Sequence, residues 1–318
     1  MKKLLVIDAL NLFIRNYVVN PSMDAKGNPV GGCIGFIKSM QKICRKFNPD
    51  EIVIAWDGHG GSASKKSQNK NYKEGRAPIR FNRRMIDLTP EQEEVNKNYQ
   101  YMTLINYLNH MPVIQLVYDY VEADDVIAYV TQMEHYKGWE KTIVSSDKDF
   151  FQLVDDETSL YLPMQDAIAD TDYLLEKYGI HPKNFAIARA IVGDPSDNLA
   201  GVKRAGFKTI RKSFEFLKEP NEASIDFLME SCNSVKKQLQ IHKNILNSED
   251  LIKSNYRIMQ LSEPSISPTS RSSIQYNVVN FEPTFTKLDV VKLLFEDGLS
   301  HNNLDFLFTM FKNFRRSQ

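Results

Sequence analysis

Nine acidic residues stand where carboxylates could do chemistry. Three of them, Glu122, Asp124 and Asp125, fall within four positions just before the apolar run 126–130, at a predicted helix N-terminus. A helix N-terminus tolerates negative charge, so part of this crowding is ordinary helix chemistry. The other six follow short apolar runs or lie in tight loops: Asp8, Asp57, Asp147, Asp149, Asp194 and Asp197.

Nine carboxylates that faced one crevice would raise each other's pKa unless cations lay between them. Oxygen ligands without His or Cys select hard ions, Mg²⁺ or Mn²⁺, over zinc. So many ligands predict two metal positions, which in such sites lie about 4 Å apart.

Four short apolar runs predict the strands that would position these acids. The runs cover 3–7, 51–56, 112–117 and 141–146, and they alternate with helical patterns at 11–19, 34–47, 90–109 and from 123 onward. This alternation predicts an α/β fold with a parallel sheet covered on both faces. Ligands bind such sheets at the carboxyl ends of the strands, where Asp8, Asp57 and Asp147 are expected. One Asp at a strand end often only caps a helix, but the recurrence in several places favours a site.

A basic stretch from Ser62 to Arg84 contrasts with the rest of the chain. It holds eight basic residues and one acidic residue, a local net charge of +7, whereas the whole chain has 40 basic and 40 acidic residues. The alternative is a solvated basic loop. A group of metal-binding carboxylates beside a strongly basic stretch favours metal-dependent hydrolysis of a phosphodiester. A phosphatase or a calcium site would explain the carboxylates but not the basic stretch.

Composition narrows the class of protein. The chain has 318 residues, 42% of them hydrophobic, which is typical of a soluble globular protein with a sizeable core. Its three cysteines lack pairing or metal spacing, which favours a reducing cytosol. No apolar run approaches ~20 residues, so no membrane span is expected.

After residue 163 the pattern becomes helical, with helices predicted at 171–178, 185–192 and within 224–255. Gly201 and Gly206 predict a tight hairpin whose amides, with Lys203 and Lys208, could bind phosphate; an ordinary turn is the alternative. Residues 264–280, rich in Ser and Pro, predict a loop or linker. The tail 288–314 predicts a helical segment whose apolar side chains serve core packing first and partner binding second.

Seven segments together resemble the 5′-nuclease family, which includes flap endonucleases, bacteriophage 5′–3′ exonucleases and the 5′-nuclease domain of bacterial DNA polymerase I. The resemblance covers about residues 3 to 215, and its anchors are LLVIDALNLFIR, GGCIGFI, IVIAWDG, NYKEGR, VEADDVIA, IVSSDKDFFQLV and IVGDPSDNLAGVKRAGFKT. It implies a PIN-like parallel-sheet nuclease core (1–170) with a basic helical arch (60–88). An all-α subdomain (171–260) with a helix–three-turn–helix near 185–218 would follow, then a linker and C-terminal helical segment (261–318).

The resemblance also implies a role for each site residue. Asp8, Asp57, Glu122, Asp124 and Asp125 would surround a first metal, and Asp147, Asp149, Asp194 and Asp197 a second. Asp8, Asp124 and Asp147 would then be catalytic, together with Lys73 and Arg76 on the scissile phosphate. DNA contacts would come from Arg15, Tyr72, Lys73, Arg76, Arg80, Gly201, Lys203, Gly206 and Lys208, with Tyr72 stacked on a base. Some family members also hold K⁺ at the hairpin. Ala9 and Ala200 depart from the family pattern without removing a ligand.

The expected activity is Mg²⁺-dependent (or Mn²⁺-dependent) hydrolysis at 5′ ends and 5′ flaps of DNA, giving 5′-phosphate and 3′-hydroxyl products by two-metal-ion catalysis. An RNA–DNA hybrid is a further expected substrate, and the chain is expected to be a cytoplasmic monomer. The tail 304–314 could dock on a replication protein. The competing hypothesis is a non-catalytic DNA-junction binder, which nine repelling carboxylates disfavour.

Overall fold

A computed structural model describes residues 1–74, 88–299 and 302–314. Its centre is a six-stranded sheet in the order β3-β2-β1-β4-β5-β6. The strands are β1 (Lys3–Asp8), β2 (Glu51–Ala55), β3 (Ile114–Leu116), β4 (Glu140–Val144), β5 (Thr158–Leu162) and β6 (Ala167–Ala169). The first five are parallel and β6 pairs antiparallel with β5, so the predicted parallel sheet is confirmed.

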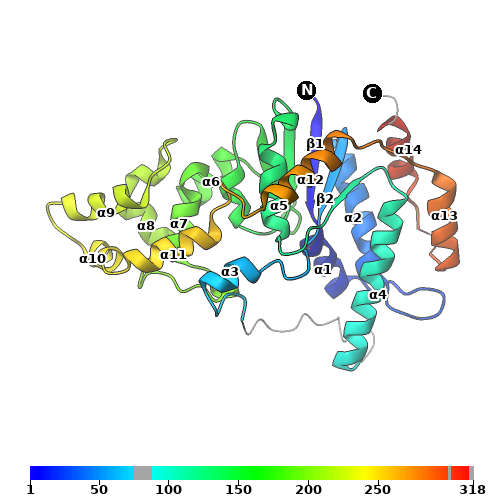
Figure 1. The fold of residues 1–318 in the computed structure, drawn as a ribbon, viewed down its shortest axis with the longest axis horizontal. Helices are drawn as coiled ribbons and strands as arrows, with labels where there is room; N and C mark the ends of the chain where they lie inside the picture. Colours follow the sequence, from blue (N-terminus) through cyan, green and yellow to red (C-terminus); the bar gives the residue numbers. More distant parts are fainter. Residues whose placement is uncertain (75–87, 300–301, 315–318) are drawn as a thin grey trace.

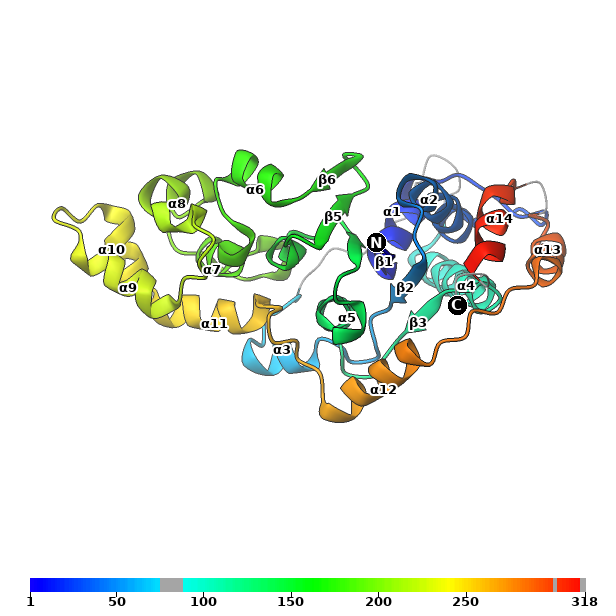
Figure 2. The same cartoon turned by 90° about the horizontal axis from the view of Figure 1, so that it is seen from above.

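Helices cover both faces of the sheet (Figure 2). Leu4 and Val6 of β1 pack into one core with α5 (Ala123–Gln132), while Leu5 and Ile7 pack into a second core. This alternation follows from the two-residue period of a strand. The second core receives α1 (Ala9–Val19), α2 (Gly31–Phe47) and α4 (Pro90–Asn109). Helix α4 begins with a capping box formed by Thr89 and Gln92.

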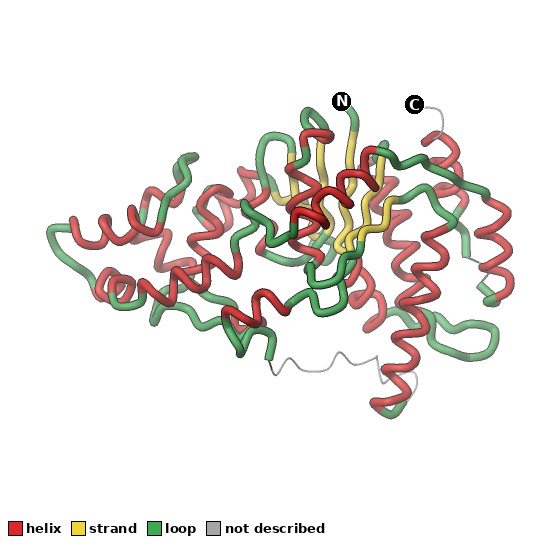
Figure 3. The backbone as a smooth tube through the Cα atoms, in the orientation of Figure 1, coloured by secondary structure: helices red, strands yellow, loops and turns green. Residues whose placement is uncertain are grey.

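Residues 171–259 form a helical lobe beside the sheet (Figures 1 and 3). Its helices are α6 (Thr171–Tyr178), α7 (Phe185–Val192), α8 (Phe207–Ser213), α9 (Ile225–Ser234), α10 (Gln240–Leu246) and α11 (Glu249–Met259). Helix α11 returns toward the sheet and packs against both α7 and the short α3 (Ala63–Gln68). Helix α11 therefore links α7, which precedes the predicted Gly201–Gly206 hairpin, with α3, which lies at the start of the basic stretch.

The prediction of a loop at 264–280 was wrong. Helix α12 (Pro268–Val279) occupies most of it and buries Ile274 and Val278 in the core that also holds α5. Its start carries an ordinary signal: the Ser267 hydroxyl accepts a hydrogen bond from the Ser270 amide at 3.1 Å, and Pro268 is the first helical residue. Serine and proline mark a helix start here, not a linker.

The C-terminal segment packs into the core. Helix α13 (Lys287–Glu296) precedes α14 (Asp305–Phe314), which lies against α2. The five apolar anchors of the tail are all buried: Leu304, Leu307, Phe308, Phe311 and Phe314. The interpretation as core packing fits this burial, which leaves these side chains unavailable to a partner in this conformation.

Candidate active site

The carboxyl edge of the sheet brings three predicted site residues together. In the parallel register, Asp8 pairs with Ala55 and Ile7 pairs with Val144. Asp57 and Asp147 follow those strand ends by two or three residues, so they emerge at the same edge as Asp8. The sequence prediction that strand ends would gather these side chains agrees with this register.

A serine directly after β4 holds two of these acids in place through hydrogen bonds. The Ser145 hydroxyl donates to Asp8 Oδ2 at 2.8 Å and accepts a hydrogen bond from the Asp147 amide at 3.1 Å. Asn11 makes a second link, because its side-chain oxygen accepts from the Ser146 amide at 3.2 Å. Sequence reasoning missed both residues; their polar side chains beside two candidate ligands were the available signal.

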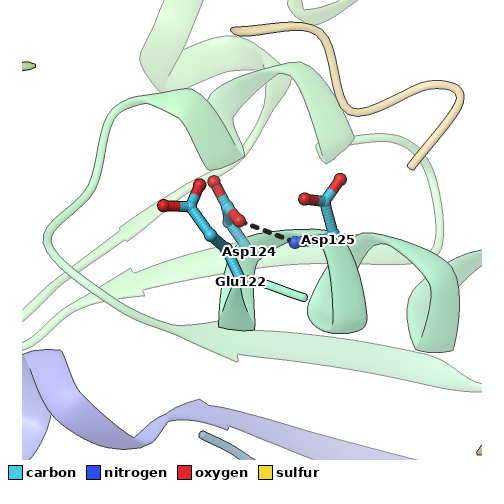
Figure 4. Close-up of side chains that lie close together, drawn as sticks. All are labelled: Glu122, Asp124 and Asp125. Atoms are coloured by element: carbon cyan, nitrogen blue, oxygen red, sulfur yellow. Dashed lines mark hydrogen bonds between the residues drawn. The ribbon is translucent and has the colours of Figure 1, made fainter. Parts of the chain in front are cut away.

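Asp57 caps a helix that belongs to another part of the chain. Its Oδ1 accepts a hydrogen bond from the Ala123 amide, the first of α5, at 3.0 Å. Glu122, the N-cap residue of α5, makes no side-chain cap bond of its own. Asp57 therefore holds the start of α5 against β2, and Glu122 and Asp124 project from that start (Figure 4).

Seven of the nine predicted carboxylates line one cavity of about 260 Å³. They are Asp8, Asp57, Glu122, Asp124, Asp147, Asp149 and Asp197. Asp125 and Asp194 lie outside this lining. Asp125 is buried and accepts a hydrogen bond from the Ser265 amide at 2.7 Å, whereas Asp194 accepts from the Ser196 amide at 2.8 Å. We call the seven lining carboxylates the acidic cage.

Arg189 is a further site residue that the sequence analysis overlooked. Its side chain is 6% exposed, and its Nε donates to Asp149 Oδ1 at 2.6 Å while another guanidinium nitrogen bonds Asp194. Burial raises the pKa of Asp194, but Ser196 and Arg189 outweigh it, so the pKa is lower than usual. The signal was one arginine within the otherwise apolar helix α7, FAIARAIV.

Two lysines lie against the Glu122 side of the cage. Lys65 Nζ is 2.6 Å from Glu122 and 2.8 Å from Asp124, and Lys73 Nζ is 2.5 Å from the other Glu122 oxygen. Lys73 has a left-handed φ of 57°, and its amide donates to the Asp197 carbonyl at 3.0 Å. This hydrogen bond ties the base of the basic stretch to the hairpin region.

The two sides of the cage differ in charge compensation. Burial alone would raise the pKa of Asp124, but Lys65 and Lys73 hold it below its usual value. Burial, with Asp57 and Asp147 nearby, raises the pKa of Asp8 to about 7. Burial and the Asp147 charge likewise raise the pKa of Asp149 to about 7, despite Arg189. The pKa values of Asp57 and Asp147 are raised too, chiefly by burial.

The uncompensated side fits a hard divalent cation. Its donors are carboxylate oxygens from three strand ends, and their pKa values are raised by burial first and by neighbouring carboxylates second. Oxygen-only donors suit Mg²⁺ or Mn²⁺. On the opposite side, Glu122, Asp124 and Asp125 place one oxygen each within 4.8 Å of one another, but Lys65 already contacts all three.

Tyr72 is nearly buried in the lining of the same cavity. The residue is 3% exposed and packs with Leu199, Ile258 and Met259, and its hydroxyl donates to Glu122 at 3.3 Å. Its stacking on a base stays a prediction. Arg76 and Arg80 lie outside the described residues. Arg15 is half-buried on α1, outside the cavity lining.

The chain between α7 and α8 makes two turns. In the first, Asp194 and Leu199 exchange backbone hydrogen bonds of 2.9 and 2.8 Å; in the second, the predicted Gly201–Gly206 hairpin, the Ala205 amide donates to the Val202 carbonyl at 3.0 Å. A Cβ on Gly201 would meet the Val192 carbonyl oxygen at 1.9 Å, so this close approach requires glycine. Asn255 of α11 supports the turn by donating to the Ala200 carbonyl at 2.8 Å. The remaining predicted phosphate contacts, Lys203, Gly206 and Lys208, are exposed.

Among residues 1–74, 88–299 and 302–314, no helix combines the length and the apolar composition needed to cross a lipid bilayer.

The match to a family model decides the family. The model describes the 5′-3′ exonuclease N-terminal resolvase-like domain and matches residues 3–179, more than half of the chain. The chain belongs to the 5′–3′ exonuclease family. A 5′-3′ exonuclease of Buchnera aphidicola is 31% identical over 211 residues, which cover 65% of this chain and 68% of that protein.

Two further similarities set the extent of the family relationship. The thermostable DNA polymerase I of Thermus thermophilus is 31% identical over 251 residues, 78% of this chain, and the chain spans 28% of that polymerase. The bacteriophage T5 flap endonuclease, solved as a complex with DNA and metal ions, has a TM-score of 0.63 at 17% identity. The match covers 99% of this chain and 98% of that one, so the two chains share a fold.

Proposed function

We propose that this 5′–3′ exonuclease family member is a structure-specific 5′ nuclease that hydrolyses phosphodiester bonds at 5′ ends and 5′ flaps of DNA. The observation that carries the proposal is the acidic cage: seven carboxylates from five separate segments line one cavity, with Lys73 also in its lining. The family relationship supports the reaction class. The products would be a 5′-phosphate and a 3′-hydroxyl.

Divalent ions are the proposed cofactors, with Asp8, Asp57, Asp147 and Asp149 as the residues most in need of added positive charge. Two Mg²⁺ or Mn²⁺ ions would supply an activated water and charge stabilisation for an in-line displacement. The protein's part is to hold the carboxylate oxygens in place through Ser145 and Arg189. A metal-containing T5 flap endonuclease with the same fold supports this cofactor class.

Basic groups around the cage would hold the substrate. Lys73 at the cavity would place positive charge where negative charge develops on the phosphate. Lys203 and Lys208 are exposed on the helical lobe, where they would contact the backbone of duplex DNA without reading its sequence. The sequence puts Arg76 and Arg80 in the same basic stretch, so we propose them as further phosphate contacts. Tyr72 would stack on a base only after leaving its buried position.

Cleavage of a 5′-labelled flap in Mg²⁺ and in EDTA tests the proposal. Wild-type protein should release short labelled products in Mg²⁺ alone, and Asp147→Asn should lower the single-turnover rate by several orders of magnitude. Asp119→Asn is the matched control, because Asp119 is an exposed aspartate in the loop between β3 and α5, outside the cavity lining. Its rate should equal that of the wild type.

Two outcomes would reject the nuclease. Folded wild-type protein that binds the flap but leaves it intact in Mg²⁺ and in Mn²⁺ would support the junction binder instead. Full activity in a folded Asp147→Asn variant would show that the acidic cage does not catalyse the cleavage. Mapping the cut positions on a flap, a nicked duplex and an RNA–DNA hybrid then defines the substrate preference.

Several finer statements remain our proposals. We propose that the protein acts as a monomer in the cytoplasm and that it also accepts RNA–DNA hybrids. K⁺ at the Gly201–Gly206 hairpin is proposed from the family resemblance. The division into a core (1–170), a helical subdomain (171–260) and a C-terminal segment (261–318) is also a proposal, in which the last segment now includes α12.

A further inference from the structure

Lys65 is a buried cation in the wall of the proposed active site. Its side chain is 7% exposed, and its Nζ lies 2.6 Å from Glu122, 2.8 Å from Asp124 and 3.8 Å from Asp125. An ammonium group is costly to bury unless carboxylates pair with it. Two of these distances are those of close ion pairs, so the buried ammonium group has carboxylate partners inside the protein.

The three carboxylates around Lys65 have the spacing of a cation site. One oxygen of each lies within 4.8 Å of the others, on the same side of the start of α5 (Figure 4). The ammonium group contacts the same oxygens that a metal ion would need. Mg²⁺ requires oxygens at about 2.1 Å in octahedral geometry, so it could not share this space with Lys65.

The oxygens of Glu122 are engaged on both sides. Lys73 contacts Oε1 at 2.5 Å, while Lys65 contacts Oε2 at 2.6 Å and the Tyr72 hydroxyl donates to the same atom at 3.3 Å. Asp124 Oδ1 accepts from the Asp125 amide at 2.8 Å, and its Oδ2 faces Lys65. Glu122 and Asp124, the two cage carboxylates on this side, thus each contact an ammonium group and accept a further hydrogen bond from the protein.

Lys65 is held in place by the packing of α3. Helix α11 packs against α3, and the two lie side by side in Figures 1 and 2. The chain after α11 brings the Ser265 amide to Asp125 Oδ1 at 2.7 Å, which leaves Asp125 Oδ2 facing Lys65 at 3.8 Å. Asp125 is 3% exposed and lies behind the cavity lining. It is therefore placed to act on Lys65 and not on a metal in the cavity.

We propose that Lys65 is a permanent internal cation that takes the place of a divalent ion between Glu122, Asp124 and Asp125. In this role it is a positioning residue: it orients Glu122 and Asp124 and directs divalent ions to the side of the cage formed by Asp8, Asp57 and Asp147. The inference rests on the proposed function for the identity of the cage. Its test counts bound ions and requires no cleavage, so the two can fail separately.

Counting Mn²⁺ bound to the full-length protein, by electron paramagnetic resonance and by titration calorimetry, tests the proposal. Lys65→Ala vacates the space and removes the ammonium group that contacts all three carboxylates, so this variant should bind one more Mn²⁺ per chain than the wild type. Lys65→Arg keeps the positive charge and should bind the wild-type number. Lys66→Ala is the matched control, because Lys66 is the exposed neighbour on the same helix; its Mn²⁺ number should not change.

Asp125→Asn keeps the proposal testable should Lys65→Ala fail to fold. Because Asp125 acts on Lys65, its amide variant should retain the wild-type Mn²⁺ number. One ion fewer in Asp125→Asn would place a metal at this position and overturn the proposal. Equal Mn²⁺ numbers in the wild type and a folded Lys65→Ala variant would overturn it as well.

Discussion

Asp8→Asn should stabilise the metal-free protein. Asp8 is surrounded by protein and by other acids, and its pKa is raised from 3.8 to about 7, chiefly by burial and then by Asp57 and Asp147. Asparagine has the same shape: its oxygen can still accept from the Asn11 amide, and its amide nitrogen can donate to the Ser145 hydroxyl. The substitution thus removes a charge while it keeps both hydrogen bonds.

The sign and size of the effect follow from proton linkage. Between the unfolded pKa of 3.8 and the folded pKa of about 7, the folded protein binds a proton that the unfolded chain has lost. Stability therefore falls as the pH rises through this window. A shift of about 3 units costs about 4 kcal/mol at pH 8, at about 1.4 kcal/mol per unit. At pH 5 the folded carboxyl is mostly protonated, and the cost is about 2 kcal/mol.

Urea unfolding in EDTA at pH 8 and at pH 5 measures this. Asp8→Asn should exceed the wild type in unfolding free energy at both pH values, and by more at pH 8. Adding Mn²⁺ should stabilise the wild type more than the variant, because the variant lacks one oxygen anion of the cage. The reasoning is refuted if metal-free Asp8→Asn is no more stable than the wild type at pH 8.

Asp166→Asn is the matched control with the opposite sign. Hydrogen bonds from Lys46 and Tyr161 lower the pKa of this exposed aspartate to about 2. Its contribution to stability is present above the unfolded pKa of 3.8 and is lost as the pH falls toward 2. The same Asp→Asn change should therefore lower stability at pH 8, where Asp8→Asn raises it.

Two further predictions concern side chains that support the site and the core. Arg189→Met leaves Asp149 and Asp194 without their buried guanidinium partner, so unfolding free energy should fall by about 3–5 kcal/mol, measured by urea titration at pH 7; an unchanged midpoint would contradict this. Phe311→Ala should cost about 3–5 kcal/mol, because this fully buried ring packs in the core of the sheet. Lys312→Ala on the exposed side of α14 is its control and should leave the stability unchanged. Equal unfolding free energies of the two variants would contradict core packing and favour a partner-binding role for the tail.

Much of the fold was predictable because its signals are local. Short apolar runs identified β1, β2, β3 and β4, and helices α6 and α7 begin and end where the pattern placed them. Strand β5 was missed because Thr158 and Ser159 dilute its apolar signal, and β6 because it is a three-residue edge strand. Helix α12 was missed because a serine-proline start was taken as loop composition.

For the site, the sequence by itself determined which chemistry is available: oxygen-only acidic side chains at strand ends and one strongly basic stretch. Residue type and the parallel-strand pattern suffice for that, because the pattern fixes which ends of the strands share an edge. Only the tertiary structure decided how charge is distributed within the cage. Lys65, Arg189 and Ser265 approach their carboxylates from 40 to 140 positions away in the sequence. Such long-range pairs depend on how the helices pack against one another, and a local sequence pattern does not predict that packing.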